Sequence, residues 1–268
     1  MPQADDTPHL SARTIRVSYG QALVLKDLDI EIPPRAFTAL IGPNGSGKST
    51  LLRTLAGLLR PEAGSIFLDN RPLAALSAKA IARRIGVLAQ APVAPEGLTV
   101  QDLVRQGRYP HRSLFGRWGR SDEDACAQAM ALTDVTQLRD RSLDSLSGGQ
   151  RQRAWIAMTL AQQTSILLLD EPTTYLDVAH QIDVMDLIGE LVHRHGKTIV
   201  AVLHDLNQAC RYASHIVAMR SGAIVAAGRP VDIVTQELTE DVFDLEAVVV
   251  RDPLFGKPMV VAKGRARR

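Results

Sequence analysis

The stretch that most constrains this chain is the loop 42–50, which reads Gly-Pro-Asn-Gly-Ser-Gly-Lys-Ser-Thr. An apolar run at 37–41 precedes it and predicts a buried strand, and leucines spaced as one face of a helix follow it at 51–59. The glycines let the backbone curl so that its N–H groups point at phosphate oxygens, and the helix dipole adds positive potential. The loop therefore predicts a nucleoside-triphosphate site.

Most residues of this loop bind phosphate through their backbone N–H groups, which form a cradle, and two residues act through their side chains. Lys48 supplies a positive charge to the β- and γ-phosphates, and Ser49 offers a hydroxyl to Mg²⁺. The cradle is completed by Gly42, Pro43, Asn44, Gly45, Ser46, Gly47 and Thr50. An ordinary glycine-rich turn is the alternative, and the full spacing between a strand and a helix argues against it.

Charge and cysteine content exclude several classes of protein. The 31 basic and 29 acidic residues nearly balance, so no strong field favours nucleic acid. The acidic start lacks a signal-like apolar segment, and no run approaches the roughly 20 apolar residues of a membrane span. Cys126 and Cys210 lie far apart in predicted helices, so we expect neither a disulfide nor a cysteine metal site. These features predict a cytoplasmic protein.

The order of apolar patterns predicts the fold class. Loose alternation over 10–32 indicates two antiparallel strands, and the apolar runs 166–170 and 198–203 indicate buried parallel strands between helices. Residues 91–145 begin with a loop rich in Pro and Gly and continue with helical patterns, a basic, aromatic segment at 108–119 and a capping box at 121–124. We expect an α/β fold: a P-loop NTPase core with a mostly parallel sheet, an N-terminal antiparallel β layer and an inserted all-helical subdomain.

A second glycine-bearing turn, Leu-Ser-Gly-Gly-Gln at 146–150, directly precedes a helical pattern. A turn of this kind at a helix N-terminus is another anion site, here with a hydroxyl added. One chain needs one phosphate cradle, so we expect the second to serve a nucleotide held by a facing subunit. Its residues are Ser147, Gly148, Gly149 and Gln150.

Taken together and in this order, the motifs resemble those of the ATP-binding subunit of an ATP-binding-cassette (ABC) transporter, with the second turn at the family's signature. The resemblance implies one ABC ATPase domain over 10–250. Within it, 10–90 and 146–228 would form the nucleotide-binding core and 91–145 the helical signature subdomain. Residues 229–268 would be a C-terminal extension with a β-hairpin and a basic tail.

The resemblance also assigns three catalytic residues, with ATP and Mg²⁺ as cofactors. Glu171 matches the general base that polarises the attacking water. His204 matches the histidine that contacts the γ-phosphate and organises that water, and Gln90 matches the glutamine that reaches Mg²⁺ and the water. Without the resemblance, Gln90 reads as a surface polar residue.

Metal and base contacts follow from the same resemblance. Asp170, together with Ser49 and Gln90, would hold Mg²⁺ and its water shell. Tyr19 matches the aromatic that stacks on adenine; a core tyrosine is the alternative. Asp177 matches the loop that contacts the opposite site. Tyr175 stands where the family often has a small residue, although an aromatic is familiar there in the subfamily described next.

Three segments, 108–118, 150–158 and 203–212, resemble the iron–siderophore, haem and cobalamin importer subfamily, with ferric enterobactin importers the best fit. The expected function is therefore ATP hydrolysis that powers ferric siderophore import across the inner membrane. A haem or cobalamin importer ATPase is the alternative, and a soluble ABC ATPase such as an iron–sulfur assembly scaffold is the alternative of another class.

The resemblance implies several partners. We expect a second, identical ATPase subunit in a head-to-tail dimer, and a multispan membrane permease that docks on the helical subdomain. A substrate-binding protein would act indirectly, and no nucleic acid is expected. The chain would then lie at the cytoplasmic face of the inner membrane as a peripheral subunit. The basic tail, Lys263, Arg265, Arg267 and Arg268, predicts a solvated terminus, with attraction to anionic lipid heads as the alternative.

Overall fold

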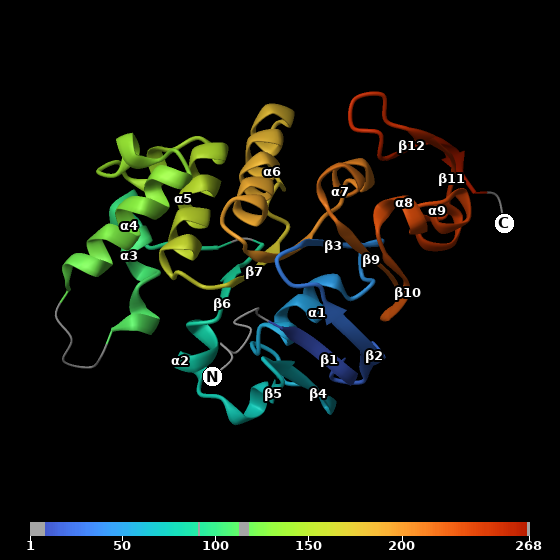
Figure 1. The fold of residues 1–268 in the computed structure, drawn as a ribbon, viewed down its shortest axis with the longest axis horizontal. Helices are drawn as coiled ribbons and strands as arrows, with labels where there is room; N and C mark the ends of the chain where they lie inside the picture. Colours follow the sequence, from blue (N-terminus) through green and yellow to red (C-terminus); the bar gives the residue numbers. More distant parts are fainter. Residues whose placement is uncertain (1–8, 91, 113–117, 267–268) are drawn as a thin grey trace, which may run out of the picture.

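The computed structural model describes residues 9–90, 92–112 and 118–266, and its centre is a six-stranded sheet (Figure 1). The strand order is β10-β9-β3-β8-β7-β6. The strands are β3 (Phe37–Ile41), β6 (Ile85–Leu88), β7 (Ile166–Asp170), β8 (Thr198–Val202), β9 (His215–Arg220) and β10 (Ala223–Gly228). All neighbours run parallel except the β9–β10 pair. The prediction of a mostly parallel sheet is confirmed.

A second, antiparallel layer has the strand order β2-β1-β4-β5. Its strands are β1 (Leu10–Tyr19), β2 (Ala22–Ile32), β4 (Ala63–Leu68) and β5 (Arg71–Pro72). Helix α1 (Lys48–Leu55) lies between the two sheets, and Leu51, Leu52 and Leu55 on one face are fully buried among residues of both (Figure 1). This packing fixes the N-terminus of α1 at the carboxyl end of β3.

Helices cover the other face of the central sheet and form one extended core with it. Helices α5 (Gly148–Ala161), α6 (Val178–His193) and α7 (Leu206–Tyr212) contact the sheet, whereas α3 (Val100–Gln106) and α4 (Arg120–Leu132) pack against α5. Short helical segments lie elsewhere along the chain: η1 (Leu73–Ala75) and α2 (Ala78–Ala82) between β5 and β6, and η2 (Tyr109–His111), η3 (Thr136–Leu138) and η4 (Leu143–Ser145) between α3 and α5. Helices α3, α4 and α5 gather at the left of Figure 1, as the inserted helical pattern predicts.

The predicted cap of helix α4 is wrong by two residues. The helix begins at Arg120 with Gly119 as its N-cap, so Ser121 lies inside the first turn. The reason is Asp122: one carboxylate oxygen accepts the backbone N–H of Gly119 at 3.2 Å, and the other accepts from Arg108 at 2.9 Å. A buried guanidinium therefore decides where the helix starts.

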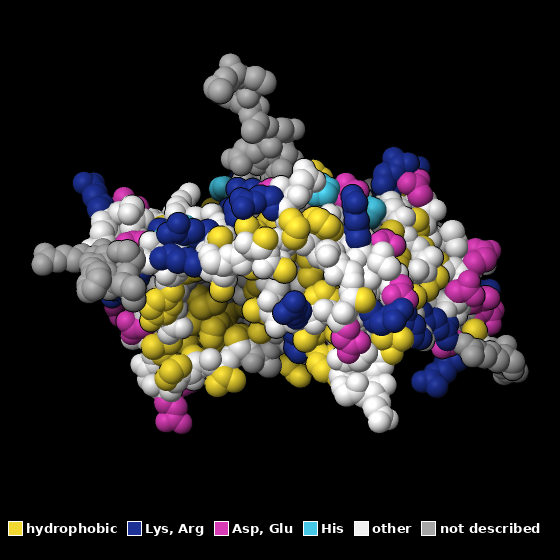
Figure 2. All heavy atoms as spheres, turned by 90° about the horizontal axis from the view of Figure 1, so that it is seen from below, with side chains coloured by type: hydrophobic (Ala, Val, Ile, Leu, Met, Phe, Trp, Pro, Cys, Tyr) yellow, Lys and Arg dark blue, Asp and Glu magenta, His cyan; other side chains and the backbone are white. Residues whose placement is uncertain are grey.

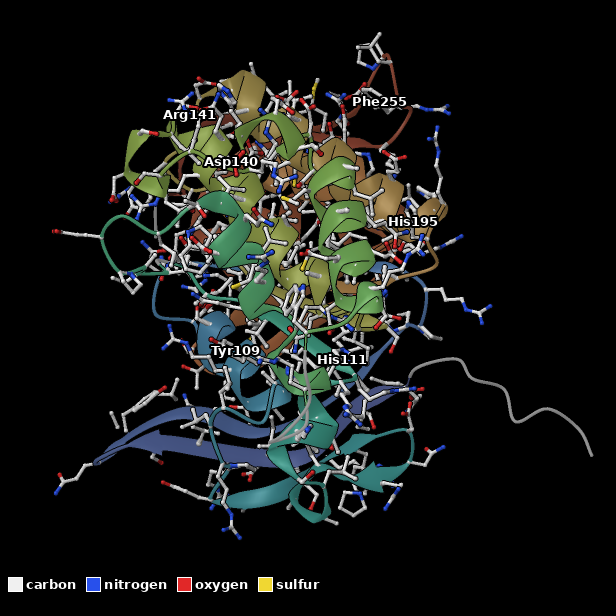
Figure 3. The ribbon with its side chains drawn as sticks, turned by 90° about the vertical axis from the view of Figure 1, so that its left-hand side faces the viewer. Tyr109, His111, Asp140, Arg141, His195 and Phe255 are labelled. Atoms are coloured by element: carbon white, nitrogen blue, oxygen red, sulfur yellow. The ribbon has the colours of Figure 1, made fainter. Side chains whose placement is uncertain are left out.

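The basic, aromatic segment at 108–112 ties the helical part to the core. Arg108 is only 4% exposed, and its Nη1 donates to Ala161 O and Gln163 Oε1, both at 2.8 Å. His111 Nε2 lies 2.7 Å from the carbonyl oxygen of Gln162. Figure 3 shows Tyr109 and His111 between the helices and the antiparallel layer. Residues 113–117, which include Phe115 of the segment that resembles the importer subfamily, lie outside the described part.

Replacing Arg108 with Met is expected to destabilise the fold by about 3 kcal/mol, because it leaves the mostly buried carboxylate of Asp122 without its cation. Urea unfolding followed by circular dichroism measures this loss. Arg194→Met removes an exposed i,i+4 pair with Glu190 and should cost below about 0.5 kcal/mol. Equal losses for the two variants would contradict the structural role of Arg108.

The C-terminal part contains α8 (Pro230–Ile233), α9 (Gln236–Phe243), β11 (Leu245–Arg251) and β12 (Pro258–Arg265). Pairing of Val248 with Val261 and of Val250 with Met259 confirms the predicted hairpin. Lys263 and Arg265 are exposed but belong to β12, where Lys263 lies 3.4 Å from Glu246. The predicted basic tail is therefore an ordered strand up to Arg265, and Arg267 and Arg268 lie outside the described residues.

Both cysteines are buried and free, Cys126 in α4 and Cys210 in α7, and both therefore lie in helices, as their sequence patterns predict. Burial raises the pKa of the Cys126 thiol to about 11 and that of Cys210 to about 12. Within the described ranges, no helix combines the length and apolarity that crossing a membrane requires. Figure 2 shows Lys and Arg interspersed with Asp and Glu on the face drawn, without one continuous basic surface.

Candidate functional site

A cavity of about 520 Å³ opens at the carboxyl edge of the central sheet, beside the N-terminus of α1. It brings together side chains that are far apart in sequence, from Tyr19 at the end of β1 to His204, two residues after β8. Its lining residues are Tyr19, Val24, Asn44, Gly45, Gly47, Lys48, Ser49, Thr50, Gln90, Glu171 and His204. Most residues predicted for one nucleotide site therefore surround one cavity.

The loop before α1 requires glycine at two of its positions for different reasons. Gly47, the N-cap of α1, has φ 100°, a conformation that L side chains rarely adopt. At Gly42 (φ 145°), an added Cβ would collide with the backbone carbonyl of Met219 and lie 2.9 Å from Ser46 Oγ. The loop is thus pressed against strand β9, and its curled backbone faces the cavity with the first N–H groups of α1.

Lys48 is only 6% exposed, and its ammonium is folded back onto the loop. Its Nζ donates to the carbonyl oxygens of Gly42 and Pro43, both at 2.9 Å. Burial lowers the pKa of Lys48, and the carboxylates of Glu171 and Asp170 oppose that shift. A desolvated cation with replaceable carbonyl partners is well suited to bind phosphate oxygens.

Asp170 ends strand β7 and contacts Ser49 at the start of α1. Ser49 Oγ donates to Asp170 Oδ1 at 2.7 Å, and the guanidinium of Arg53 lies 3.7 Å from Oδ2. Burial raises the pKa of Asp170, whereas the Ser49 hydrogen bond and the Arg53 charge oppose the rise. Oδ2 is buried without a hydrogen-bond partner. A hydroxyl and a carboxylate with an unsatisfied oxygen fit the oxygen ligands that Mg²⁺ prefers.

Glu171 follows Asp170 directly and has φ 54°, a left-handed conformation that is uncommon outside glycine. Its Oε1 lies 2.7 Å from His204 Nε2, and its Oε2 accepts from Thr174 Oγ1 at 2.9 Å. Burial raises the pKa of Glu171, but hydrogen bonds from His204, Thr174 and Gln90 outweigh it and hold the pKa below its ordinary value. The carboxylate is therefore ionised and aimed at the cavity.

The second glycine turn does not line this cavity. Ser147 is the N-cap of α5, its hydroxyl accepts from Gln150 N at 3.3 Å, and Gln150 Oε1 accepts from Ser147 N at 3.2 Å. Figure 1 shows α5 in the helical part, away from α1. Within the described chain, the loop 42–50 and the turn 147–150 thus lie in separate places.

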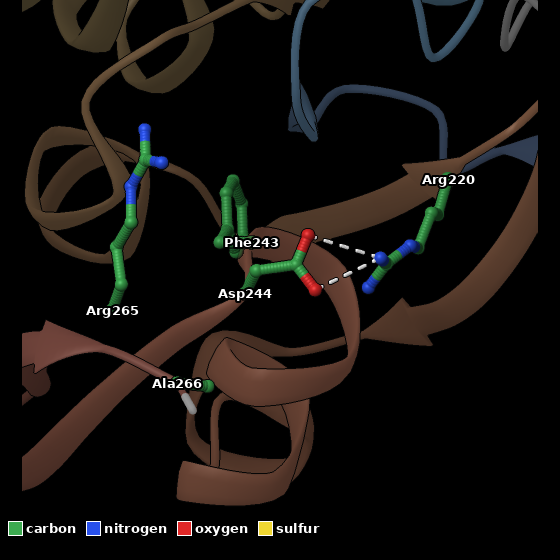
Figure 4. Close-up of a pocket in the computed structure, with 5 residues that line it drawn as sticks. All are labelled: Arg220, Phe243, Asp244, Arg265 and Ala266. Carbon is green, nitrogen blue, oxygen red and sulfur yellow. Dashed lines mark hydrogen bonds and ion pairs between the residues drawn. The ribbon is translucent and has the colours of Figure 1, made fainter. Parts of the chain in front are cut away.

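Another cavity, of about 510 Å³, lies among C-terminal elements (Figure 4). Its lining residues are Arg220, Phe243, Asp244, Arg265 and Ala266. Arg220 Nη2 donates to both carboxylate oxygens of Asp244 at 3.0 Å, so its central charges neutralise each other. This cavity has no element of the nucleotide site.

Sequence reasoning missed three contacts at the site. Val24 lines the cavity from β2, Thr174 holds Glu171, and Arg53 faces Asp170. Arg53 follows Ser49 by one helical turn, a spacing that sequence could reveal once Asp170 is placed. Val24 is an ordinary strand residue, and no sequence signal distinguishes it.

The fold and the site define a P-loop ATPase. The family model described as ABC transporter matches residues 25–174. The ferric enterobactin transport ATP-binding protein FepC of Escherichia coli (strain K12) is 53% identical over 97% of this chain and 96% of its own length. The petrobactin import ATP-binding protein FpuD of Bacillus anthracis is 51% identical over 97% and 95%.

A solved structure agrees with these relatives. The dimeric structure of MJ0796, a bacterial ABC transporter cassette, superimposes with a TM-score of 0.73 at 27% identity, covering 82% of this chain and 98% of that one. The chain belongs to the ABC transporter family, as one of its ATP-binding, ATP-hydrolysing subunits. Its resemblance to the siderophore-importer subfamily is confirmed by the relatives.

Proposed function

We propose that this chain hydrolyses ATP to power the import of a ferric siderophore through a separate membrane permease. The observation that carries the proposal is the cavity in which Lys48, Glu171 and His204 meet, in a chain similar over nearly its whole length to FepC and FpuD. Both relatives are named for siderophore transport, whereas the haem, cobalamin and iron–sulfur scaffold alternatives have no comparable support here.

In the proposed reaction, the curled loop binds the phosphates and Lys48 moves its ammonium from loop carbonyls to the β- and γ-phosphates. Tyr19 lies at the cavity rim, 50% exposed, where adenine can stack on its ring. Glu171 acts as general base toward the attacking water, and His204 holds Glu171 and contacts the γ-phosphate. Gln90, which makes a hydrogen bond to Glu171, would contact the same water.

Ser49, Asp170 and Gln90 are the residues that would hold Mg²⁺. When bound, the ion supplies positive charge that neutralises the phosphates. The unsatisfied Asp170 Oδ2 and the adjacent Ser49 hydroxyl support this assignment. The present Ser49–Asp170 hydrogen bond keeps the two ligands together before the ion arrives.

We further propose that two identical chains pair head to tail. The turn 147–150 lies away from the chain's own cavity and presents a helix N-terminus, so it is suited to a nucleotide held by the facing subunit. Cassettes of this family dimerise. Ser147 and Gly149 of one subunit would then complete the γ-phosphate site of the other.

The permease would dock in a groove of about 450 Å³ on the helical part. Its lining residues are Leu98, Asp102, Arg105, Gln106, Tyr109, Arg112 and Trp118. Tyr109 is 63% exposed there, and large exposed aromatics are typical of interface anchors. This docking places the chain at the cytoplasmic face of the inner membrane, with the substrate-binding protein acting only through the permease.

Arg112→Glu is expected to abolish siderophore-dependent growth while the isolated subunit keeps its rate of ATP hydrolysis. Arg112 is exposed in the groove, so its reversed charge would repel a complementary partner without touching the nucleotide cavity. Growth on a ferric siderophore and phosphate release by the purified chain measure the two effects. Arg194→Glu, at the exposed residue that follows α6, is the matched control. Loss of basal hydrolysis in R112E would count against the groove assignment.

Growth of a deletion strain tests the function itself. With ferric siderophores as the sole iron source, the strain should fail to grow, and the wild-type gene but not Glu171→Gln should restore growth. If the strain grew normally on ferric siderophores but failed to use haem or cobalamin, the transported compound would be haem or cobalamin and not a ferric siderophore. Co-purification with soluble assembly proteins and no membrane protein would overturn the transporter proposal.

A further inference from the structure

Gly149, the second residue of helix α5, lies directly beneath the imidazole of His180 from helix α6. A Cβ added to Gly149 would lie 2.7 Å from His180 Cγ and 3.0 Å from Nε2, and closest of all to Cδ2. These separations are shorter than van der Waals contact, so any larger residue at position 149 would force the ring out of this position. The glycine turn at 147–150 is therefore shaped by a side chain thirty-one positions along the chain.

The position of His180 is itself fixed by Asp177. Asp177 Oδ1 accepts the backbone N–H of His180 at 2.9 Å and the ring Nδ1 at 2.8 Å. The hydrogen bond from the backbone N–H of His180, and after it the one from the ring, lower the pKa of Asp177 below its ordinary value. The carboxylate is therefore ionised. The bond assigns the proton to Nδ1 and orients the ring over Gly149.

Further contacts join the same two segments. Gln152 Nε2 donates to Pro172 O at 2.8 Å, which links the first turns of α5 to the residue after Glu171. Leu176 Cδ2 would lie 3.8 Å from a Cβ at Gly148. The start of α5 thus rests on the loop that runs from Glu171 to Asp177, and His180 makes the closest of these contacts.

We propose that His180 is a positioning residue for hydrolysis. Its ring locks the turn 147–149 to the Asp177 loop, so that both reach the partner's nucleotide as one preformed surface. The inference rests on the proposed head-to-tail dimer, in which this turn and this loop face the opposite site. In this proposal, His180 itself does not contact ATP.

The variants separate the two contacts of the ring. His180→Phe keeps a ring over Gly149 but cannot donate to Asp177, whereas His180→Asn keeps a donor near the Nδ1 position and removes the ring. His180→Ala removes both. Gly149→Ala forces a Cβ against the ring, and the double variant Gly149→Ala with His180→Ala relieves that collision. His193→Ala, an exposed histidine at the end of the same helix, is the control.

The experiment measures ATP-driven dimerisation in a Glu171→Gln background by light scattering, together with monomer affinity for a fluorescent ATP analogue and the thermal midpoint. We expect H180A to weaken dimerisation by at least about tenfold, the lower end for one lost hydrogen bond to a charged group. H180F and H180N should show intermediate losses, and H193A none. Analogue affinity and thermal midpoint should stay unchanged, and the G149A/H180A double variant should dimerise better than G149A alone.

Three results would overturn the inference while leaving the proposed dimer intact. Dimerisation of H180A, H180F and H180N equal to that of the parent would show that the ring positions nothing. Additive losses in the G149A/H180A pair would show that the two residues act independently. A lower thermal midpoint with equally weakened analogue binding in all three His180 variants would reduce His180 to a fold-stabilising residue. If the Glu171→Gln parent itself fails to dimerise with ATP, the proposed dimer fails, and this inference fails with it.

Discussion

Replacing Glu171 with Gln is expected to lower the rate of ATP hydrolysis by at least about 100-fold, the lower end for loss of a general base. The amide cannot accept a proton from water, yet it is isosteric and can keep a hydrogen bond to Thr174. ATP binding should therefore persist, since the loop 42–50 and Lys48 are unaltered. Phosphate release and equilibrium binding of a fluorescent ATP analogue measure the two quantities.

Glu190→Gln is the matched control for this change. Glu190 is a glutamate on helix α6 whose carboxylate pairs with the exposed Arg194, and it has no place in the nucleotide cavity. Its variant should hydrolyse ATP at the normal rate. Wild-type turnover in E171Q would show that another group accepts the proton, and the mechanism proposed here would be wrong.

Lys48→Ala is expected to weaken ATP binding by about 10- to 150-fold, the equivalent of one lost hydrogen bond between charged groups. The ammonium is almost fully buried and held by two carbonyls of the phosphate loop, so it needs only to exchange these carbonyls for phosphate oxygens when ATP binds. Its removal also leaves those carbonyls without their donor. Calorimetric titration with ATP measures the affinity.

The control for Lys48 is Lys263→Ala, which removes an exposed lysine of strand β12. Its affinity for ATP should match that of the parent. A Lys48→Ala chain that binds ATP normally and keeps its thermal midpoint would contradict the phosphate contact. A large fall in thermal midpoint would instead assign the ammonium a structural role in the loop.

Much of the architecture could be predicted because short-range chemistry decides it. The loop 42–50 fixes a strand–loop–helix unit, and the fully apolar runs ending at Asp170 and near His204 can only be buried strands of a covered sheet. Parallel strands share one carboxyl edge, so these ends had to meet near the same cavity. The distances between Glu171, His204 and Thr174 follow from that meeting.

What sequence reasoning missed depends on contacts between distant residues. The start of α4 is decided by Arg108, whose burial between α4 and α5 leaves no local signal. The left-handed backbone of Glu171 likewise has no local sequence signal, because residues other than glycine rarely adopt it. Position 180 shows no motif of its own, and only the fold brings its ring onto Gly149.

The central claim is that each nucleotide site is shared between two subunits, and mixing two inactive variants tests it most directly. Lys48→Ala disables the phosphate loop of one chain, and Ser147→Arg disables the signature turn of the other. Each variant alone lacks an intact site. In a head-to-tail hybrid, however, one site contains both defects and the other contains none.

The account predicts that an equimolar mixture regains about one quarter of wild-type hydrolysis, because half of the random dimers are hybrids and each hybrid has one intact site of two. Phosphate release by the mixture, compared with each variant alone, is the measurement. A mixture as inactive as its components would contradict shared sites and show that each chain completes its own.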